Sequence, residues 1–174
     1  MSRKPIIVFW LIPARPERDL LRELIRILGK QCGAPRFEPH LSVLAMAARG
    51  TSPQTILRKL KARPVHLRLG GVACAATFTK TLFVRLTPGP ALNRITLDLA
   101  NAAGARTKIM RAPHISLLYR KLPARARKDL AATIKLPFRH IRFDSIKAVQ
   151  CVSLTRTAAK VKRWKVLATK SLRQ

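Results

Sequence analysis

The chain contains two short apolar segments in which a histidine and a serine stand one residue apart. These His-Ser segments are Pro39-His40-Leu41-Ser42-Val43-Leu44 and Pro113-His114-Ile115-Ser116-Leu117-Leu118, and they hold two of the four histidines. A β-strand directs alternate side chains to opposite faces, so the histidine and the serine of each segment share a face. Each segment is therefore predicted to be a strand with one buried apolar face and one face that presents an imidazole beside a hydroxyl.

The two His-Ser segments occupy matching places in a repeated pattern of strands and helices. Apolar residues recur at helical spacing on both sides of each segment, and Ser52-Pro53 is typical of a helix start. The predicted order is strand 6–12, helix 16–29, strand 36–45 and helix 52–60 in the first half, and strand 81–86, helix 90–99, strand 112–119 and helix 123–130 in the second.

This repetition predicts a single α+β domain over residues 1–174, built from two similar halves, about 1–70 and 71–174. A length of 174 residues suits one domain with a sizeable core. Two halves related by an approximate two-fold axis would bring their equivalent strands together in the middle. The cleft between the halves is therefore where His40 and His114 could meet.

The remaining strands are predicted from apolar runs and turn residues. Residues 65–69 alternate between apolar and polar side chains, which indicates a half-exposed strand that ends at a turn formed by Gly70 and Gly71. Residues 6–12 lack such alternation, as is typical of a strand buried on both faces. The tail is predicted to form three further strands, over residues 138–143, 146–154 and 164–167.

The chain is strongly basic, with 36 Lys and Arg against seven acidic residues and a formal net charge of +29. A protein of this charge attracts polyanions such as RNA, DNA and anionic membrane surfaces. Because the excess runs along the whole chain, it favours a positive surface on a folded body over a disordered basic arm. A general basic bias among the proteins of the source organism is the open alternative.

The cysteines and the apolar runs indicate a cytoplasmic protein without a membrane anchor. Cys32, Cys74 and Cys151 are odd in number and far apart, with no CxxC pair, which indicates reduced thiols and no structural zinc. The longest apolar runs are too short to span a bilayer. We therefore expect no metal, no other cofactor and no membrane partner.

With these features the chain resembles the two-histidine phosphoesterase superfamily, whose hallmark is a pair of His-x-Thr/Ser motifs on opposed strands. Within it, the chain is most similar to the cyclic phosphodiesterases, on the evidence of both His-Ser segments and of the N-terminal strand that contains Trp10. The resemblance implies a duplicated, bilobal α+β fold with pseudo-two-fold symmetry. In that fold antiparallel sheets line a central cleft and helices pack outside.

The resemblance also implies an activity, the metal-independent hydrolysis of a 2′,3′-cyclic phosphate, usually to a 2′-phosphate. A place for Tyr119 beside the substrate requires the strand to end or bulge at this residue, because strict alternation from His114 would direct the Tyr119 side chain to the opposite face. The roles implied by position are an acid and base pair for His40 and His114, phosphate contacts for Ser42 and Ser116, and aromatic walls beside the substrate for Trp10 and Tyr119.

These residue types suit that chemistry. A histidine with a pKa near 6.5 can be neutral or protonated at working pH, so one imidazole can accept a proton from water while the other donates to the departing ribose oxygen. Hydroxyl groups beside them can stabilise the negative charge that develops on the phosphate oxygens. The sequence leaves open which histidine is the base, and in the superfamily the base usually comes from the second motif.

Two other functions fit the same features. The chain could be a non-catalytic module that binds RNA or nucleotides, or an RNA-end enzyme of the same superfamily, such as a 2′-5′ RNA ligase-like protein or a 3′ exonuclease. The expected partner is a nucleotide or an RNA that bears a cyclic phosphate, with the basic surface available to RNA and the chain itself a monomer. Arg111, Arg120 and Lys121, next to the second His-Ser segment, are candidates for steering a phosphate.

Overall fold

The chain folds into an α+β structure around one antiparallel sheet, seen in a computed structural model that describes residues 5–48, 50–152 and 155–173. The strands run in the order β2-β1-β6-β3-β4-β5, and β7 pairs with β6. The elements in chain order are β1 (Pro5–Pro13), α1 (Glu17–Cys32), β2 (Leu41–Ala47), α2 (Pro53–Lys59), β3 (Val65–Cys74), the 3-10 turn η1 (Phe78–Lys80), β4 (Leu82–Leu86), α3 (Pro90–Ala103), β5 (His114–Leu118), α4 (Ala124–Thr133), β6 (His140–Val152), α5 (Ala158–Val161) and β7 (Lys165–Ser171).

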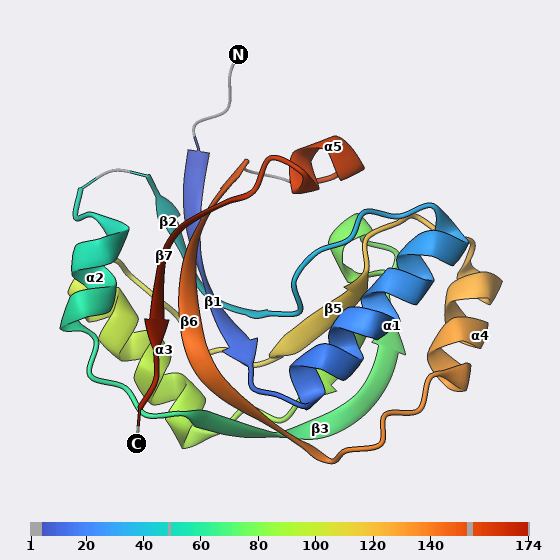
Figure 1. Ribbon diagram of the computed structural model, residues 1–174, viewed down its shortest axis with the longest axis horizontal. Coiled ribbons are helices and arrows are strands. Elements are labelled where there is room, and N and C mark those ends of the chain that lie inside the picture. The colour runs from blue at the N-terminus through green and yellow to red at the C-terminus, as the bar shows by residue number, and fades with distance from the viewer. Residues whose placement is uncertain (1–4, 49, 153–154, 174) are drawn as a thin grey trace.

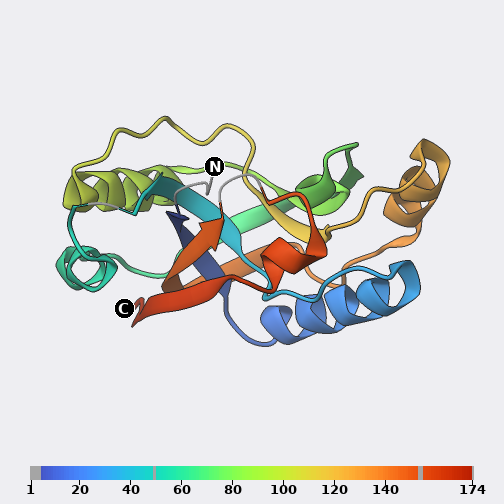
Figure 2. The ribbon, with the colours of Figure 1, turned by 90° about the horizontal axis from the view of Figure 1, so that it is seen from above.

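The repeated plan predicted from the sequence is confirmed. The first series is β1-α1-β2-α2 and the second is β4-α3-β5-α4, with a His-Ser segment at the third element of each. The four longer helices lie outside the strands, α2 and α3 toward one end and α1 and α4 toward the other (Figures 1 and 2). The predicted fold class, α+β with antiparallel pairing and external helices, is therefore correct.

The two His-Ser strands lie at the two ends of the strand order, and β7 branches from β6 as a further edge. β2 ends the sheet on one side and β5 ends it on the other, yet the two strands contact each other. The sheet must therefore curl until these two strands meet. β2 begins at Leu41, later than residue 36 where the sequence predicted its start, because residues 34–40 have no regular secondary structure. His40 thus lies one residue before its strand, and His114 is the first residue of β5.

The long strand β6 joins the two parts of the sheet. On one edge it pairs with β1 over residues 143–152, and on the other it pairs with β3 over 140–143 and with β7 over 145–150. The sequence predicted separate strands over 138–143 and 146–154, and this break is wrong. Although Asp144 and Ser145 are typical turn residues, the Asp144 carbonyl accepts from Leu172 N at 2.7 Å and Ser145 pairs with both neighbouring strands. Leu154, the predicted end, lies outside the described residues.

The predicted turn at Gly70 and Gly71 is also wrong, because β3 continues through both glycines. Leu69 pairs with Leu86 and Val72 with Val84, so β3 has one residue more than β4 between these pairs. This extra residue is a β-bulge, and Gly71 adopts φ +89° in it, a conformation that side-chain-bearing residues rarely take. The bulge bends β3 at the place where the sheet passes from β6 to β4.

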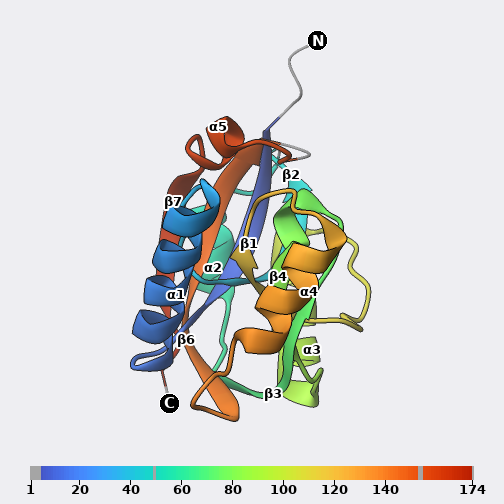
Figure 3. The ribbon, with the colours of Figure 1, turned by 90° about the vertical axis from the view of Figure 1, so that its right-hand side faces the viewer.

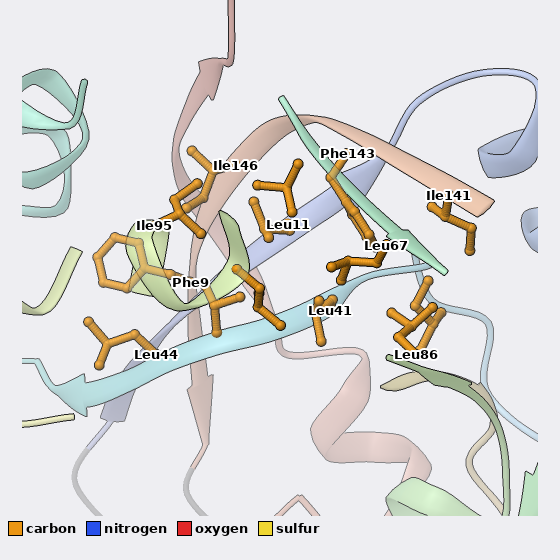
Figure 4. Packing of buried hydrophobic residues seen from close by; sticks show 14 of the residues in the cluster. Phe9, Leu11, Leu41, Leu44, Leu67, Leu86, Ile95, Ile141, Phe143 and Ile146 are labelled. Atoms are coloured by element: carbon orange, nitrogen blue, oxygen red, sulfur yellow. The ribbon is translucent and has the colours of Figure 1, made fainter. Parts of the chain in front are cut away.

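Buried apolar side chains fill both faces of β1. Phe9 and Leu11 point into the main core with residues of β2, β3, β6 and α3 (Figure 4). Trp10 and Ile12 point the other way, into a smaller cluster with Val149. The non-alternating apolar run therefore does correspond to a strand buried on both faces, as predicted.

Strands from the two sequence halves interleave in the sheet. β6 and β7, from residues 71–174, extend the ladder that β1 and β2 form. β3 spans the boundary between the halves and pairs with β6 over residues 65–68 and with β4 from Leu69 onward. Seen from the side, α1 and α4 lie in front of these strands (Figure 3). No helix in the described ranges combines the length and the apolar composition needed to cross a membrane.

Candidate active site

One cavity of about 640 Å³ brings together the six predicted catalytic and substrate-binding residues and the candidate cation Lys121. The other two candidate cations, Arg111 and Arg120, are not in its lining, and Arg120 donates to the Gly33 carbonyl at 3.3 Å. The cavity volume lies in the range of small-molecule sites. Leu41, Val43, Ile115 and Leu117 are buried in the main core, so the two His-Ser segments direct their polar residues to the cavity side, as alternation predicted. The predicted residues that line the cavity are Trp10, His40, Ser42, His114, Ser116 and Tyr119.

Both histidines make the same backbone contact. The Nδ1 atom of His40 lies 2.6 Å from the Glu38 carbonyl oxygen, and that of His114 lies 3.1 Å from the Ala112 carbonyl oxygen. A carbonyl oxygen can only accept, so Nδ1 carries the hydrogen in each ring. The Nε2 atom of each neutral imidazole is then the nitrogen that can accept a proton.

A proline makes this contact stiff in both segments. Pro39 separates Glu38 from His40, and Pro113 separates Ala112 from His114. Proline fixes its own φ and restricts the residue before it to extended conformations. The proline therefore restricts the backbone between the carbonyl and the histidine that it orients. The repeated Pro-His dipeptide was visible in the sequence as a signal for this arrangement.

Burial favours the neutral form of both imidazoles. The His40 side chain is 6 % exposed, and this burial lowers its pKa to about 4, against the effect of its hydrogen bond to Glu38 and with a further lowering from His114. Burial also lowers the pKa of His114, and the nearby Lys80 ammonium acts in the same direction. An anionic phosphate bound between the rings would favour the protonated form and raise both pKa values.

The lowered pKa of His40 predicts a loss of stability in acid. The folded-state pKa of about 4 lies below the ordinary value of 6.5, so the unfolded chain takes up a proton first as the pH falls. The contribution of His40 is fully present above pH 6.5, and the free energy of unfolding is expected to fall by about 3 kcal/mol as the pH drops to 4. Urea unfolding at several pH values measures this. The non-titrating variant His40→Asn should lose less stability over the same interval, and an equal loss would contradict the prediction.

The two serines are placed differently. Ser42 is exposed, whereas Ser116 is buried and its hydroxyl donates to the Thr79 carbonyl at 2.7 Å. To donate to a phosphate oxygen, the Ser116 hydroxyl must exchange this carbonyl for the ligand. Ser42 is therefore the more accessible of the two hydroxyl donors.

The predicted aromatic residues are walls of the cavity with little free surface. The Trp10 ring stacks on the His40 ring, with centroids 3.7 Å apart, and the Tyr119 ring stacks on Phe37 at 3.9 Å. Each of Trp10 and Tyr119 is only 4 % exposed. Tyr119 reaches the cavity because β5 ends at Leu118, which removes the constraint of alternation. Trp10 therefore supports His40, in addition to bounding the space for a substrate.

Among the lining residues that sequence reasoning missed, Arg156 and Trp164 bear most on the chemistry of the cavity. Trp164 lies edge-on to Trp10, with centroids 5.1 Å apart. Arg156 joins Lys121 as a cation of the lining, and none of the described residues that line the cavity is acidic. Both residues follow β6, far in the sequence from either His-Ser segment, and no local pattern marks them. Their cationic and aromatic groups make the cavity suited to an anion with an aromatic part.

The described parts of the chain hold no group of three His, Cys, Asp or Glu side chains that could bind a metal ion. Cys151 also lines the cavity, but burial raises the pKa of its thiol to about 12. A thiol with this pKa is not a nucleophile at neutral pH. Cys151 is thus not a candidate nucleophile, and the histidines and serines are candidate reactive groups of the lining beside Lys121.

Several solved structures share the fold of this chain over nearly its whole length, at low sequence identity. The structure of E. coli LigT with ATP is similar to this chain with a TM-score of 0.55 and 16% identity, and the match covers 99% of this chain and 100% of LigT. The complex of E. coli LigT with 3′-AMP gives a TM-score of 0.56 at 14% identity over the full length of both chains.

TT0787 of Thermus thermophilus is also similar, with a TM-score of 0.58, 17% identity and coverage of 97% of this chain and 98% of TT0787. At such identities the likeness establishes the fold. No protein-family model and no curated protein sequence matches the chain.

Proposed function

We propose that the chain is a metal-independent phosphodiesterase that hydrolyses 2′,3′-cyclic phosphates of nucleotides or RNA ends to 2′-phosphates. The observation that carries this proposal is the equivalent arrangement of His40 and His114. Each ring donates from Nδ1 to the carbonyl two residues earlier, and both rings line one cavity together with a serine hydroxyl. Two Nε2 atoms are thus available for the two proton transfers that the hydrolysis requires.

The proposed reaction uses one histidine for each proton transfer. Following the resemblance, His114 Nε2 accepts a proton from water as the water oxygen attacks phosphorus. His40, protonated in the presence of the bound phosphate, donates from Nε2 to the ribose 3′ oxygen as the bond from phosphorus to that oxygen breaks. Ser42 and Ser116 donate to the remaining phosphate oxygens, where negative charge develops. The product keeps a 2′-phosphate, and both histidines return to their initial forms by proton exchange with solvent.

The composition of the cavity and the charge of the chain support a nucleotide or RNA substrate. Lys121 and Arg156 line a cavity whose described lining lacks carboxylates, and the chain carries a net charge of +29. E. coli LigT, which shares the fold, has been solved in complexes with ATP and with 3′-AMP. A positive cavity attracts such anions from a distance.

Incubation with the four 2′,3′-cyclic mononucleotides in the presence of EDTA tests the proposal. We expect turnover that EDTA does not abolish, with 2′-phosphates identified by phosphorus NMR. A cyclic phosphate that binds but persists unchanged for hours would overturn the hydrolase proposal in favour of a binding module. Restoration of activity only by added metal would overturn the metal-independent mechanism.

A second arm of this assay addresses the RNA-end alternatives. An oligonucleotide with the same cyclic end is compared with the mononucleotide at about 50 mM and 200 mM salt. Since the positive charge attracts the polymer more strongly, kcat/KM should favour the oligonucleotide at low salt, and the preference should shrink at high salt. Joining of ends, or shortening of the oligonucleotide, would instead identify a ligase-like or exonuclease activity.

A further inference from the structure

An ion pair ties the segment that carries His40 to the middle of the sheet. The Lys147 ammonium donates to both carboxylate oxygens of Glu38, at 2.8 and 2.7 Å. Each of these side chains is only 23 % exposed. By contrast, the Arg94–Asp98 pair joins residues four positions apart on α3, with the arginine largely exposed. The Glu38–Lys147 pair therefore links distant parts of the chain in surroundings where water screens it less.

Glu38 is also the residue that orients His40. Its carbonyl oxygen accepts the hydrogen bond from His40 Nδ1, while its carboxylate accepts from Lys147. Glu38 lies in residues 34–40, where no helix or strand fixes the backbone. Phe37, the residue before Glu38, is held by stacking on Tyr119. Glu38 itself is anchored to strand β6 by its ion pair with Lys147.

The His40 ring has a second support, from Trp10, next to Lys147 on the sheet. Lys147 of β6 pairs directly with Trp10 of β1, and side chains paired in this way lie on one face of the sheet. Trp10 stacks on the ring of His40, and Lys147 holds the residue whose carbonyl binds its Nδ1. The equivalent residue before His114 is Ala112, whose methyl group cannot form an ion pair.

We propose that Lys147 is a positioning residue for the phosphodiester hydrolysis proposed above. Through Glu38, it keeps the carbonyl against His40 Nδ1 and so fixes both the hydrogen on Nδ1 and the direction of Nε2. Lys147 is not among the described residues that line the cavity, so it acts through His40 and not on the substrate. This inference concerns one histidine of the pair, since His114 is held without it.

The variant Lys147→Met tests the proposal, with Arg94→Met as the matched control because it removes an exposed ion pair on a helix that does not line the cavity. NMR of the ring nitrogens of ¹⁵N-labelled histidine at neutral pH reports which nitrogen carries the hydrogen. We expect His40 in Lys147→Met to lose its uniform Nδ1-protonated form while His114 keeps it. We also expect kcat to fall about tenfold or more with little change in KM, because Nε2 is misplaced. Lys147→Arg, which preserves the pair, should restore both properties.

Unchanged His40 ring-nitrogen signals and unchanged kcat in Lys147→Met would overturn the proposal, as would an equal change at His114. If Lys147→Met does not fold, Glu38→Gln provides the same test, because it removes the charge with little change in volume. The NMR measurement needs no substrate. Failure of the proposed hydrolysis would appear as an inactive wild-type protein, and failure of this inference as wild-type His40 signals in the variants.

Discussion

Replacing His114 or His40 with alanine is expected to lower kcat for hydrolysis of a 2′,3′-cyclic nucleotide about 10²- to 10⁴-fold. Each substitution removes one of the two Nε2 atoms that the proposed reaction needs, and neither Ser42 nor Ser116 can take over a proton transfer near neutral pH. Initial rates in EDTA at saturating substrate measure the effect. Circular dichroism establishes that each variant is folded.

The other two histidines provide matched controls. His66 on β3 and His140 on β6 are exposed, and neither lines the cavity. His66→Ala and His140→Ala should therefore retain wild-type kcat. Near wild-type turnover in His40→Ala or His114→Ala would rule out the paired-histidine mechanism, and loss of activity in all four variants would indicate a nonspecific effect.

Replacing Phe143 with alanine is expected to lower the free energy of unfolding by about 3–5 kcal/mol. Phe143 is fully buried and lies on β6 where this strand pairs with both β1, through Pro13, and β3, through Val65 (Figure 4). Its loss would leave a cavity at the junction of the two parts of the sheet. Because both parts share this strand, urea unfolding should occur in a single transition. Its midpoint should shift by the same amount whether it is measured by tryptophan fluorescence or by circular dichroism.

Leu97→Ala is the control for this experiment, since Leu97 is 47 % exposed on α3. A surface substitution of this kind should change the free energy of unfolding by no more than about 0.5 kcal/mol. A similarly small effect of Phe143→Ala would show that the junction contributes little to stability. Two separate transitions would show that the parts of the sheet unfold independently.

Local signals in the sequence were sufficient for most of the fold. Ser52 caps α2 as predicted, since its side chain accepts from Thr55 N at 3.2 Å, and Pro53 begins that helix. Pro90 likewise begins α3. In these cases the residues that determine the structure are neighbours in the sequence, so caps and helical spacing were enough to predict it.

The errors arose where distant strands overrode local preference. Asp144 and Ser145 favour a turn, but their backbones pair with strands that lie far away in the sequence. Gly70 and Gly71 also favour a turn, and the neighbouring β4 accommodates them as a bulge instead. The free energy of these pairings depends on tertiary neighbours, which a local pattern does not contain.

The candidate site, like the fold, could be predicted where residues close in the sequence determine it. The histidines and serines could be predicted because a period of two places them on one face of a strand, and that face does line the cavity. Three other residues could not be predicted: Lys147 on β6, and Arg156 and Trp164 on either side of α5. They are far in the sequence from both His-Ser segments, and only the tertiary fold brings them near the site. The roles of all these residues in catalysis stay predictions until the variants above are measured.

The curl of the sheet has a consequence for the behaviour of the protein in solution. Edge strands present unpaired backbone groups that can pair with other chains and start aggregation. Besides β7, which pairs with β6 alone, the sheet has two edges, β2 and β5, and these two contact each other. The bend at Gly71 in β3 helps to bring them together. A change that flattened this bend would separate the two histidines and at the same time expose two unpaired edges, so the solubility of the chain and its candidate site depend on the same curvature.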